Sequence, residues 1–446
     1  MRVEREKRTI IEPKVLKGFR DFLPSMEIPK KAIVNKLEEH FSLYGFVPID
    51  TPVLEYTEVL LGKGGGETDK QIFHFLDNGD RDVALRFDLT VPFARFLALH
   101  QNELAFPFKR FHIDKVWRGE KPQKGRFREF TQCDFDIVGV DSAEADYEIL
   151  SMMESSFEVM GVTDFKFCIA HRGLFNAFLS YLDVEKQSVE ILRIVDKLKK
   201  IGKADVLTQL KACTGTQEKA DKILNYITVE DEGEPFLTTL ERLSTLAGGE
   251  AEHTNRMKTI YGYLSDAGIA EHFTLDSSIT RGLDYYTGIV YETFLTKLPH
   301  FGSVCSGGRY NDLASLYTKE QLPGVGSSIG LDRLLAALEE LDSPLIKRAR
   351  SAELIIFCLD ESLRSWYDKL ARAFRKEGIR TDVYLLGKKM GAQFKYAEAK
   401  NIPYGLSCGL DEQSSGKVTL KNLQTREMHQ MITIEEAISI IKKELI

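Results

Sequence analysis

A long helical stretch between two strand-rich segments limits the architectures open to this chain. Residues 83–140 alternate short strand-like runs with turns, and strand-like runs resume at 274–295 and near 302–306. Between them, residues 173–270 carry leucine and isoleucine at helical spacing and few β-type runs. A sheet built from both strand-rich segments must therefore be interrupted, and we expect an inserted helical domain at 182–262.

The C-terminal part of the chain differs in pattern and in charge. After a linker-like stretch at 343–351, strand-like and helical runs alternate over 352–446, which predicts a small α/β domain. Residues 343–446 carry 18 Lys and Arg against 13 Asp and Glu, a net charge of +5, while the remainder carries −12. A mildly basic module on an acidic body is compatible with a polyanionic partner.

Composition excludes several classes of protein. The 446 residues suggest roughly three domains, and 43% hydrophobic with 28% charged residues is ordinary for a globular protein. The chain has no apolar run long enough for a membrane span, and its charged N-terminus has no secretory signal. The six cysteines form no C-x-x-C pair and there is no H-E-x-x-H pattern, so no catalytic metal held by the protein is indicated. We expect a cytoplasmic protein with free thiols.

The N-terminal half begins with a helix and an interrupted strand. Apolar residues at helical spacing predict an amphipathic helix at 29–44 that starts near Pro29. The run FVPIDTPVLEY (46–56) is strand-like, but proline cannot donate to a sheet ladder, so it should lie at an edge or leave the sheet near Pro52. LGKGGGETDK (61–70) fits neither the Walker nor the dinucleotide-binding glycine pattern, and we expect a mobile loop there.

Three arginines stand at the ends of strand-like or glycine-rich runs: Arg118, Arg281 and Arg333. Around the first of them, residues 115–138 read as strand, charged loop and strand. A hairpin of this kind can hold a planar substrate and present its loop to a second partner, although a solvated hairpin tip is the alternative interpretation. Around the second, RGLDYYTG (281–288) directly precedes a strand-like run rich in β-branched and aromatic residues, an unusual place for an arginine, an aspartate and two tyrosines.

These stretches resemble the signatures of class II aminoacyl-tRNA synthetases, and specifically those of the histidyl-tRNA synthetase family. The matches are co-linear and cover almost the whole chain. They are GFRDFLP (18–24) for the N-terminal signature, 45–60 for motif 1, 110–138 for motif 2, 324–338 for motif 3, and RGLDYYTG with SGGRYNDL (306–313) for the two histidine-specific motifs. Two positions depart from the family's frequent residues, because Asn311 stands where Asp is common and Asp88 where Glu is common.

The resemblance implies a fold and a division of the chain. The expected fold is an α+β catalytic core, an antiparallel sheet flanked by helices, with a helical insertion and a C-terminal α/β anticodon-binding domain. Motif 1 builds the dimer interface in the family, so the resemblance also implies a homodimer. The expected boundaries are an N-terminal extension at 1–16, the core at 17–181 and 263–342, the insertion at 182–262, a linker at 343–351 and the anticodon-binding domain at 352–446.

The resemblance also implies ligation of L-histidine to its tRNA through a histidyl-adenylate made from ATP. The histidine carboxylate is already ionised near neutral pH, so the first step needs no general base. It needs fixed cations that meet the charge building on the α-phosphate, and Arg281 and Arg118 are the expected catalytic residues. A guanidinium suits this task because it donates to two oxygens and keeps its proton. The alternative is a catalytically inactive paralogue that regulates histidine biosynthesis, although such proteins usually lack the anticodon-binding module.

The same resemblance assigns the remaining site residues. Mg²⁺ should arrive with ATP, and its protein ligands are not implied. The expected residues are Asp88, Leu89, Thr90, Gln132, Asp136, Tyr285 and Tyr286 for histidine; Arg118, Glu120, Arg126, Phe127 and Arg333 for ATP; and Lys121, Gln123 and Arg128 for the acceptor end of the tRNA. The C-terminal module should bind the anticodon.

Overall fold

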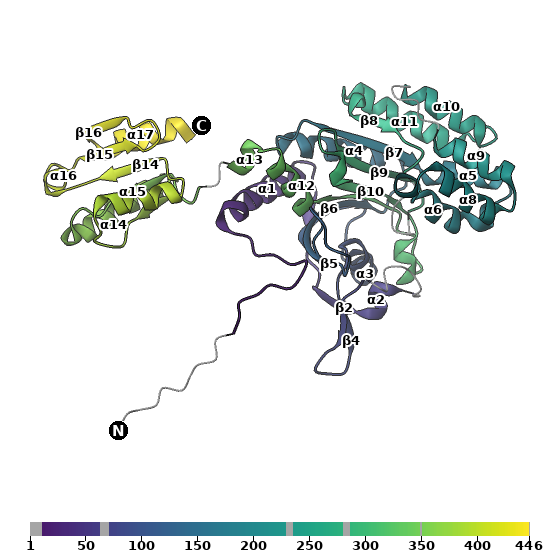
Figure 1. Cartoon of the computed structure of the whole chain (residues 1–446), viewed down its shortest axis with the longest axis horizontal. Helices are drawn as coiled ribbons and strands as arrows, with labels where there is room; N and C mark the ends of the chain where they lie inside the picture. Colours follow the sequence, from purple (N-terminus) through teal and green to yellow (C-terminus); the bar gives the residue numbers. More distant parts are fainter. Residues whose placement is uncertain (1–10, 63–70, 229–234, 280–285, 348–349, 446) are drawn as a thin grey trace. The chain divides into compact units, whose positions relative to one another are not determined.

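The computed structural model of the chain describes residues 11–62, 71–228, 235–279, 286–347 and 350–445 (Figure 1). None of the helices in these ranges combines the length and apolar character that a membrane span requires. The chain divides into two compact units, which are described separately: Met1–Asp21 with Ile33–Leu341, and Phe22–Ala32 with Asp342–Ile446.

The first unit is built on an eight-stranded sheet in which the two strand-rich segments of the sequence meet. Most neighbours are antiparallel, and only the pairs at the two ends of the sheet are parallel. The order across the sheet is β1 (Val47–Pro48), β5 (Phe108–Trp117), β6 (Glu129–Val138), β11 (Gly324–Gly330), β10 (Cys305–Tyr310), β9 (Ile289–Leu295), β7 (Phe165–His171) and β8 (Phe273–Leu275).

One face of this sheet is apolar because side chains alternate along each strand. Helix α1 (Pro24–Leu43) packs Phe41 against Phe135, with ring centroids 4.9 Å apart. Helix α4 (Ala143–Val159) packs Phe157 against Phe165 at 4.9 Å. Rings and aliphatic side chains on this face are almost wholly buried, so the main core of the unit lies between the sheet and these two helices.

The opposite face carries small and polar residues. The register of β5, β6, β11 and β10 places Asp136, Gly326 and Gly308 across from one another, and Asp134, Ser328 and Ser306 in the next row. A methyl group at Gly326 would lie 1.9 Å from Asp136 Oδ1, so a side chain there would displace the carboxylate. This polar face is therefore built for close approach of other groups rather than for packing.

A small three-stranded sheet lies beside the large one. Its order is β2 (Leu54–Tyr56), β4 (Asp82–Leu85), β3 (His74–Leu76). It is joined to helices α2 (Thr57–Leu61) and α3 (Thr90–His100). The run 46–56 thus contributes an edge strand to the large sheet and then leaves for another sheet, which confirms the prediction made from its prolines.

Between β7 and β8 the described residues form helices and turns only, as the sequence predicts. Figure 1 shows these helices gathered at the β7–β8 end of the sheet. Arg256 of α11 binds them to the core, because its Nε lies 2.7 Å from Asp146 Oδ2. The helices are α5 (Arg172–Tyr181), η2 (Glu185–Gln187), α6 (Ser188–Val195), α7 (Leu198–Ile201), α8 (Lys203–Thr214), α9 (Gln217–Ile227), α10 (Phe236–Leu246), α11 (Glu252–Asp266) and η3 (Ala270–His272).

Three shorter elements complete the first unit: η4 (Pro299–Phe301), η5 (Leu313–Leu316) and helix α12 (Leu331–Glu340), which follows β11 directly. The prediction for α1 was wrong at its start. The helix begins at Pro24 rather than near Pro29, and Pro29 lies inside it. Proline is preorganised for the first helical position, so Pro24 fits that place.

The second unit is a small α/β domain with its own core. Its sheet is parallel at β12, β13 and β14 and antiparallel at β15 and β16. The predicted linker at 343–351 includes a short helix, α13 (Pro344–Lys347). The strands in sheet order are β13 (Thr381–Val383), β12 (Leu354–Ile356), β14 (Tyr404–Ser407), β15 (Val418–Asn422) and β16 (Met428–Ile432); the helices are η6 (Glu361–Leu363), α14 (Arg364–Lys376), α15 (Met390–Ala399), α16 (Leu410–Ser415) and α17 (Ile434–Leu445).

Candidate active site

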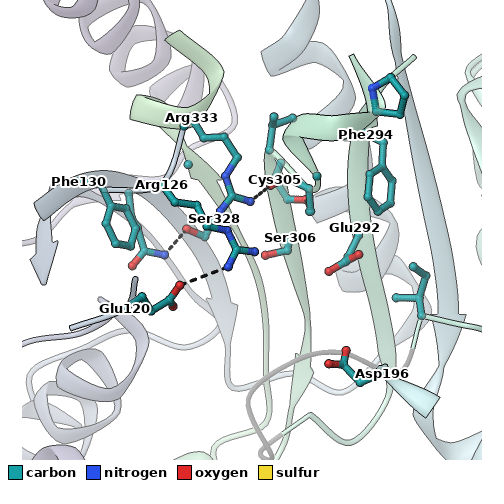
Figure 2. A pocket seen from close by; sticks show the side chains of 18 of the residues that line it. Glu120, Arg126, Phe130, Asp196, Glu292, Phe294, Cys305, Ser306, Ser328 and Arg333 are labelled. Carbon is teal, nitrogen blue, oxygen red and sulfur yellow. Dashed lines mark hydrogen bonds and ion pairs between the residues drawn. The ribbon is translucent and has the colours of Figure 1, made fainter. Parts of the chain in front are cut away.

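A cavity of about 410 Å³ opens on the polar face of the large sheet. Figure 2 shows Glu120, Arg126 and Arg333 on one side of it, with Glu292, Phe294 and Asp196 across from them. The last of these comes from the helical stretch, between α6 and α7. Six of the predicted site residues line this cavity: Arg118, Glu120, Arg126, Phe127, Gln132 and Arg333.

The predicted hairpin forms one wall. Strands β5 and β6 pair over their whole length, from Phe108↔Val138 to Trp117↔Glu129, and residues 118–128 connect them. Arg118 is held at the end of β5, because its Nε donates to the Phe87 carbonyl at 2.9 Å and its guanidinium lies over the Phe130 ring. The wall is thus fixed before any ligand arrives.

Three guanidinium groups, of Arg118, Arg126 and Arg333, line the cavity together with three carboxylates, of Glu120, Glu292 and Asp196. Arg126 Nη1 lies 3.3 Å from Glu120 Oε2, and Arg333 Nη1 donates to the Ser303 carbonyl at 2.5 Å. Burial, followed by the neighbouring Arg126, lowers the pKa of Arg333 to about 10. Even so, Arg333 keeps its proton at neutral pH. The side of the cavity that these arginines line therefore suits a polyanion, while Glu292 and Asp196 lie across from it.

Beside the cavity lies a cluster of buried carboxyl groups, Asp88, Asp134 and Asp136, which surround the buried Arg110. Arg110 Nη2 lies 2.7 Å from Asp136 Oδ2, and Tyr310 donates its hydroxyl proton to Asp136. Burial raises the pKa of Asp88 to about 6 and that of Asp134 to about 7, and it also raises the pKa of Asp136. Arg110 opposes each of these shifts.

Among the described residues, several acceptor atoms in this region have no hydrogen-bond partner. Asp88 Oδ1 accepts from the Val91 amide in the first turn of α3, at 3.1 Å, but Asp88 Oδ2 is buried without a hydrogen bond among the described residues. The same holds, within those residues, for Gln132 Oε1 and Asp134 Oδ1. Gln132 donates its Nε2 to Ser328 at 2.7 Å, so its oxygen is turned away from that serine. Buried unpaired acceptors cost free energy, and a ligand rich in N–H donors would satisfy them.

The other residues predicted for catalysis and histidine binding differ in whether the structure describes them and in how buried they are. Arg281 and Tyr285 lie outside the described residues, as does most of the predicted mobile loop. Leu89 is fully buried, and Thr90 begins α3. Tyr286 packs against two small apolar clusters, one with Ala94, Tyr310 and Leu313, the other with Ala170, Ile279 and Val290.

The three residues predicted to meet tRNA differ in their environment. Lys121 and Gln123 are exposed at the tip of the hairpin. Arg128 is half-buried, and its Nε donates to the Glu120 carbonyl at 3.1 Å while its Nη1 reaches the Lys17 carbonyl at 3.4 Å. Its guanidinium therefore already holds backbone groups of the loop.

Sequence reasoning missed Arg110, Asp134, Ser328, Glu292 and Asp196. For one of them, Asp134, a signal was present. Gln132, Asp134 and Asp136 stand at every second position of a predicted strand, so they must share one face. No comparable signal marks Asp196, because its place at the cavity depends on how the helices pack.

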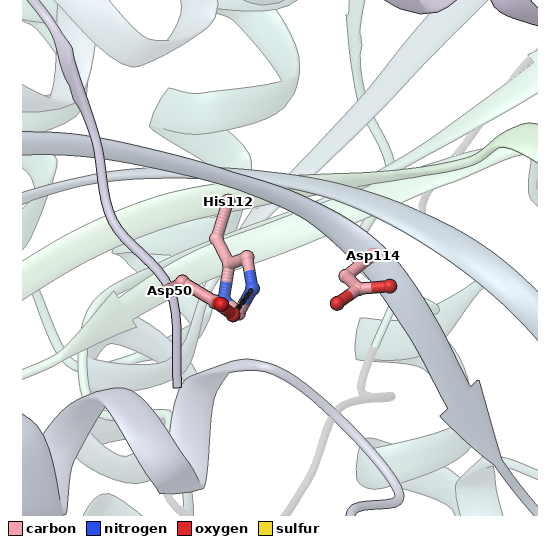
Figure 3. Close-up of side chains that lie close together, drawn as sticks. All are labelled: Asp50, His112 and Asp114. Carbon is pink, nitrogen blue, oxygen red and sulfur yellow. Dashed lines mark ion pairs between the residues drawn. The ribbon is translucent and has the colours of Figure 1, made fainter. Parts of the chain in front are cut away.

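A second cluster of polar side chains lies near the edge strand β1. Asp50, His112 and Asp114 offer ligand atoms within 4.8 Å of one another (Figure 3). However, Arg86 Nη2 lies 2.5 Å from Asp114 Oδ2, and Arg86 is fully buried. Burial, then Arg110 and Arg86, lower the pKa of His112 to about 3. The cluster lacks the excess negative charge that a cation site requires, and we assign no metal to it.

Comparisons with known proteins agree with this geometry. The family model described as histidyl-tRNA synthetase matches residues 18–334, and the one described as anticodon binding domain matches 353–444. A histidine–tRNA ligase of Treponema denticola is 55% identical over 89% of this chain and 89% of its own. The crystal structure of histidyl-tRNA synthetase from Nostoc sp. PCC 7120 has a TM-score of 0.86 at 32% identity, covering 98% of this chain and all of that one.

A further structural neighbour shares the fold. It is described as an ATP phosphoribosyltransferase regulatory subunit/histidyl-tRNA synthetase from Bacillus halodurans, with a TM-score of 0.73 at 24% identity over 89% of this chain and 99% of that one. At this identity the likeness concerns the fold alone.

Proposed function

Because this chain belongs to the histidyl-tRNA synthetase family, we propose that it joins L-histidine to its cognate tRNA at the cavity lined by Arg118, Arg126 and Arg333. The observation that carries the proposal is that these three cations line a cavity beside buried acceptor atoms of Asp88, Gln132 and Asp134, which have no hydrogen-bond partner among the described residues. A polyanionic nucleotide would bind the arginines, and a substrate with an ammonium group and an imidazole N–H would donate to the unpaired acceptors.

In the first step a histidine carboxylate oxygen attacks the α-phosphorus of ATP. The bond to the β-phosphate oxygen breaks, and pyrophosphate leaves with the electron pair. Arg118 stands beside the end of β5, where it would meet charge on the α-phosphate, and Arg333 at the start of α12 would bind the γ-phosphate. Phe127 would stack on the adenine, with Glu120 and Arg126 beside it. Mg²⁺ would enter as part of the nucleotide substrate, near Glu120 and Glu292.

Histidine would lie at the boundary between the cavity and the buried carboxyl cluster. Its ammonium group would pair with Asp88 and Gln132, and its ring with Asp136 and the tyrosines at 285 and 286. Recognition of both ring nitrogens excludes amino acids of similar size, because they would leave buried groups unpaired.

In the second step the terminal ribose hydroxyl of the tRNA attacks the histidyl carbonyl carbon, and AMP leaves. Lys121 and Gln123 at the hairpin tip are exposed enough to meet the acceptor end. The second unit matches an anticodon-binding domain. Exposed leucines follow the carboxyl ends of its parallel strands: Leu359, Leu385, Leu386 and Leu410. We place the anticodon there, since unstacked bases bind apolar side chains flanked by cations.

We further propose a homodimer that works in the cytoplasm. The small sheet exposes apolar residues in and near motif 1, including Tyr56 at 50% and Leu76 at 66%. Apolar side chains exposed on both outer strands of one sheet favour a protein partner. All six cysteines are free, which suits a reducing compartment. Sedimentation at micromolar concentration tests the dimer, and a monomer would contradict it.

The test of the proposed function is histidine-dependent exchange of pyrophosphate into ATP, run against a panel of amino acids. We expect exchange with histidine alone. We also expect Arg281→Ala to lower the exchange rate about 10²–10⁴-fold, as for other groups that stabilise developing charge. A folded dimer that binds histidine without exchange would instead indicate the regulatory alternative.

A further inference from the structure

The N-terminal segment (residues 16–21) does not line the cavity, yet it contacts two elements that do. Arg20 lies over the ring of Phe127, with its Cζ 3.9 Å from the ring centroid. Its Nη2 also donates to Asp332 Oδ1 at 2.9 Å. One side chain therefore contacts both the hairpin loop and the first turn of α12.

Asp332 extends this contact to the sheet. Its carboxylate is almost wholly buried, and its second oxygen accepts from the Thr131 amide of β6 at 2.6 Å. Asp332 directly precedes Arg333, whose guanidinium lines the cavity. Because the partners of Asp332 are a cation and a backbone amide, its position determines where the helix start lies against β6.

The backbone of the same segment supports the loop a second time. The Arg128 amide donates to the Gly18 carbonyl at 2.8 Å. Gly18 has a φ of +89°, and a methyl group on it would come within 2.8 Å of the Arg128 side chain. Only glycine allows the segment to lie this close to the loop.

We propose that Arg20 is a positioning residue for the nucleotide, holding Phe127 and the start of α12 at the separation that ATP requires. The proposal rests on the function proposed above. Arg20 does not line the cavity, so we infer that it acts on the ligand through Phe127 and Asp332. A cation against one face of the Phe127 ring restricts the ring, and the pair with Asp332 is largely shielded from water, since the side chains are 24% and 2% exposed.

The experiment compares Arg20→Gln, Arg20→Lys and the unaltered protein in pyrophosphate exchange. We expect Arg20→Gln to raise KM for ATP about tenfold, the size of one lost contact of this kind. KM for histidine should stay within twofold. Arg20→Lys keeps the charge without the planar group, and should recover part of the loss.

The matched control is Arg256→Gln, which removes another partly buried arginine paired with aspartates but lying outside the cavity. An equal rise in KM for ATP in this control would show that loss of stability, rather than positioning, explains the effect, and would overturn the proposal. An unchanged KM in Arg20→Gln would do the same.

A double-mutant cycle with Phe127→Leu tests the route of the effect. If part of the effect of Arg20 passes through the ring, the double variant should lose less than the product of the two single losses, since coupled residues are not additive. Full additivity would contradict this route.

Calorimetric binding of ATP without histidine separates the proposal from the function on which it rests. Arg20→Gln should weaken ATP binding about tenfold even if the unaltered chain shows no exchange. Absence of exchange would overturn the proposed function, whereas unchanged ATP affinity would overturn the role of Arg20.

Discussion

The two faces of the eight-stranded sheet are made by the same strands but have different roles: one packs against helices, and the other lies open beside the cavity. On β6, Phe135 lies on the face covered by α1, where it is fully buried against Phe41. Its neighbours Asp134 and Asp136 lie on the other face, beside the cavity and with unpaired or charge-paired oxygens. One residue step along a strand thus separates packing from ligand binding, and substitutions on the two faces should fail in different ways.

The largest effect is expected on the covered face. Phe135→Ala removes a buried ring and should lower the free energy of unfolding by about 3–5 kcal/mol. The KM values for ATP and histidine should remain near normal in the folded fraction. Urea denaturation measures the first quantity and pyrophosphate exchange the second. A specific rise in KM for histidine would break the distinction between the faces.

The next effect concerns the open face. Gly326→Ala would place a methyl group 1.9 Å from Asp136 Oδ1 and push the carboxylate away from Arg110. Misplacing a binding group by about 1 Å should lower kcat/KM for histidine about 10²-fold. Gly262→Ala is the control, because no atom lies within 4 Å of a methyl group at that position of α11. Equal losses in both variants would contradict the assignment.

The third-largest effect is expected from the titration of His171 on the covered face, measured as a change in stability with pH. His171 stands at the end of β7 in register with the covered face, and its Nδ1 accepts from the Leu174 amide. Burial lowers the pKa of His171 to about 3. Its folded pKa lies below its unfolded pKa, so its stabilisation is present above about pH 6.5 and is lost as pH falls towards 3.

The slope of stability against pH tests this. Between pH 6 and 4 this residue should contribute about 1.4 kcal/mol of lost stability per pH unit. In His171→Asn, which keeps an acceptor for the Leu174 amide, the slope should be flatter by that amount. An unchanged slope would show that His171 does not remain neutral in the folded protein.

The smallest effect concerns Asp134, the titrating group of the open face. Burial, opposed by Arg110 and assisted by Asp136 and Asp88, raises the pKa of Asp134 to about 7. Its folded pKa exceeds its unfolded pKa, so this group destabilises the fold as pH rises from about 4 to 7, the reverse of His171.

The titration of Asp134 also predicts how KM for histidine should change with pH. Below pH 7 Asp134 takes up a proton and no longer adds negative charge to the carboxyl cluster beside the proposed ammonium site. Lowering pH from 8 to 6 should therefore raise KM for histidine, by up to about tenfold. Asp134→Asn should weaken this dependence and leave the titrations of Asp88, whose pKa is about 6, and of free histidine. Kinetics across this range, with KM for ATP as the internal reference, would show an unchanged slope in the variant if Asp134 made no contribution.

Local pattern predicted much of the fold. The spacing of apolar residues predicted the helical stretch, and the alternation on either side of the loop at 118–128 predicted the β5–β6 hairpin. The spacing of apolar residues missed that α1 starts at Pro24, although proline suits the first helical position. Nor could it predict the strand order, since β6 pairs with β11 across the whole helical stretch.

The site was predictable to the extent that motifs carry it. Arg118, Arg126 and Arg333 gather at one cavity, as the resemblance to a known family led us to expect. Arg110 was not predicted, because its role depends on burial beside Asp136, and a local sequence pattern does not indicate burial of that kind. Arg20 lies in a recognised signature, but only the three-dimensional arrangement links it to Phe127 and Asp332.

The pairing of β6 with β11 also has a consequence for synthesis of the chain. Gln132 and Ser328 are neighbours across these strands but lie 196 positions apart. At about 5–20 residues per second, a ribosome needs roughly 10–40 s to deliver the second strand after the first. During that time the nascent hairpin has an open edge, the kind of surface that pairs with foreign strands. The helices that separate the two halves therefore set the length of time for which a chaperone would have to protect this edge.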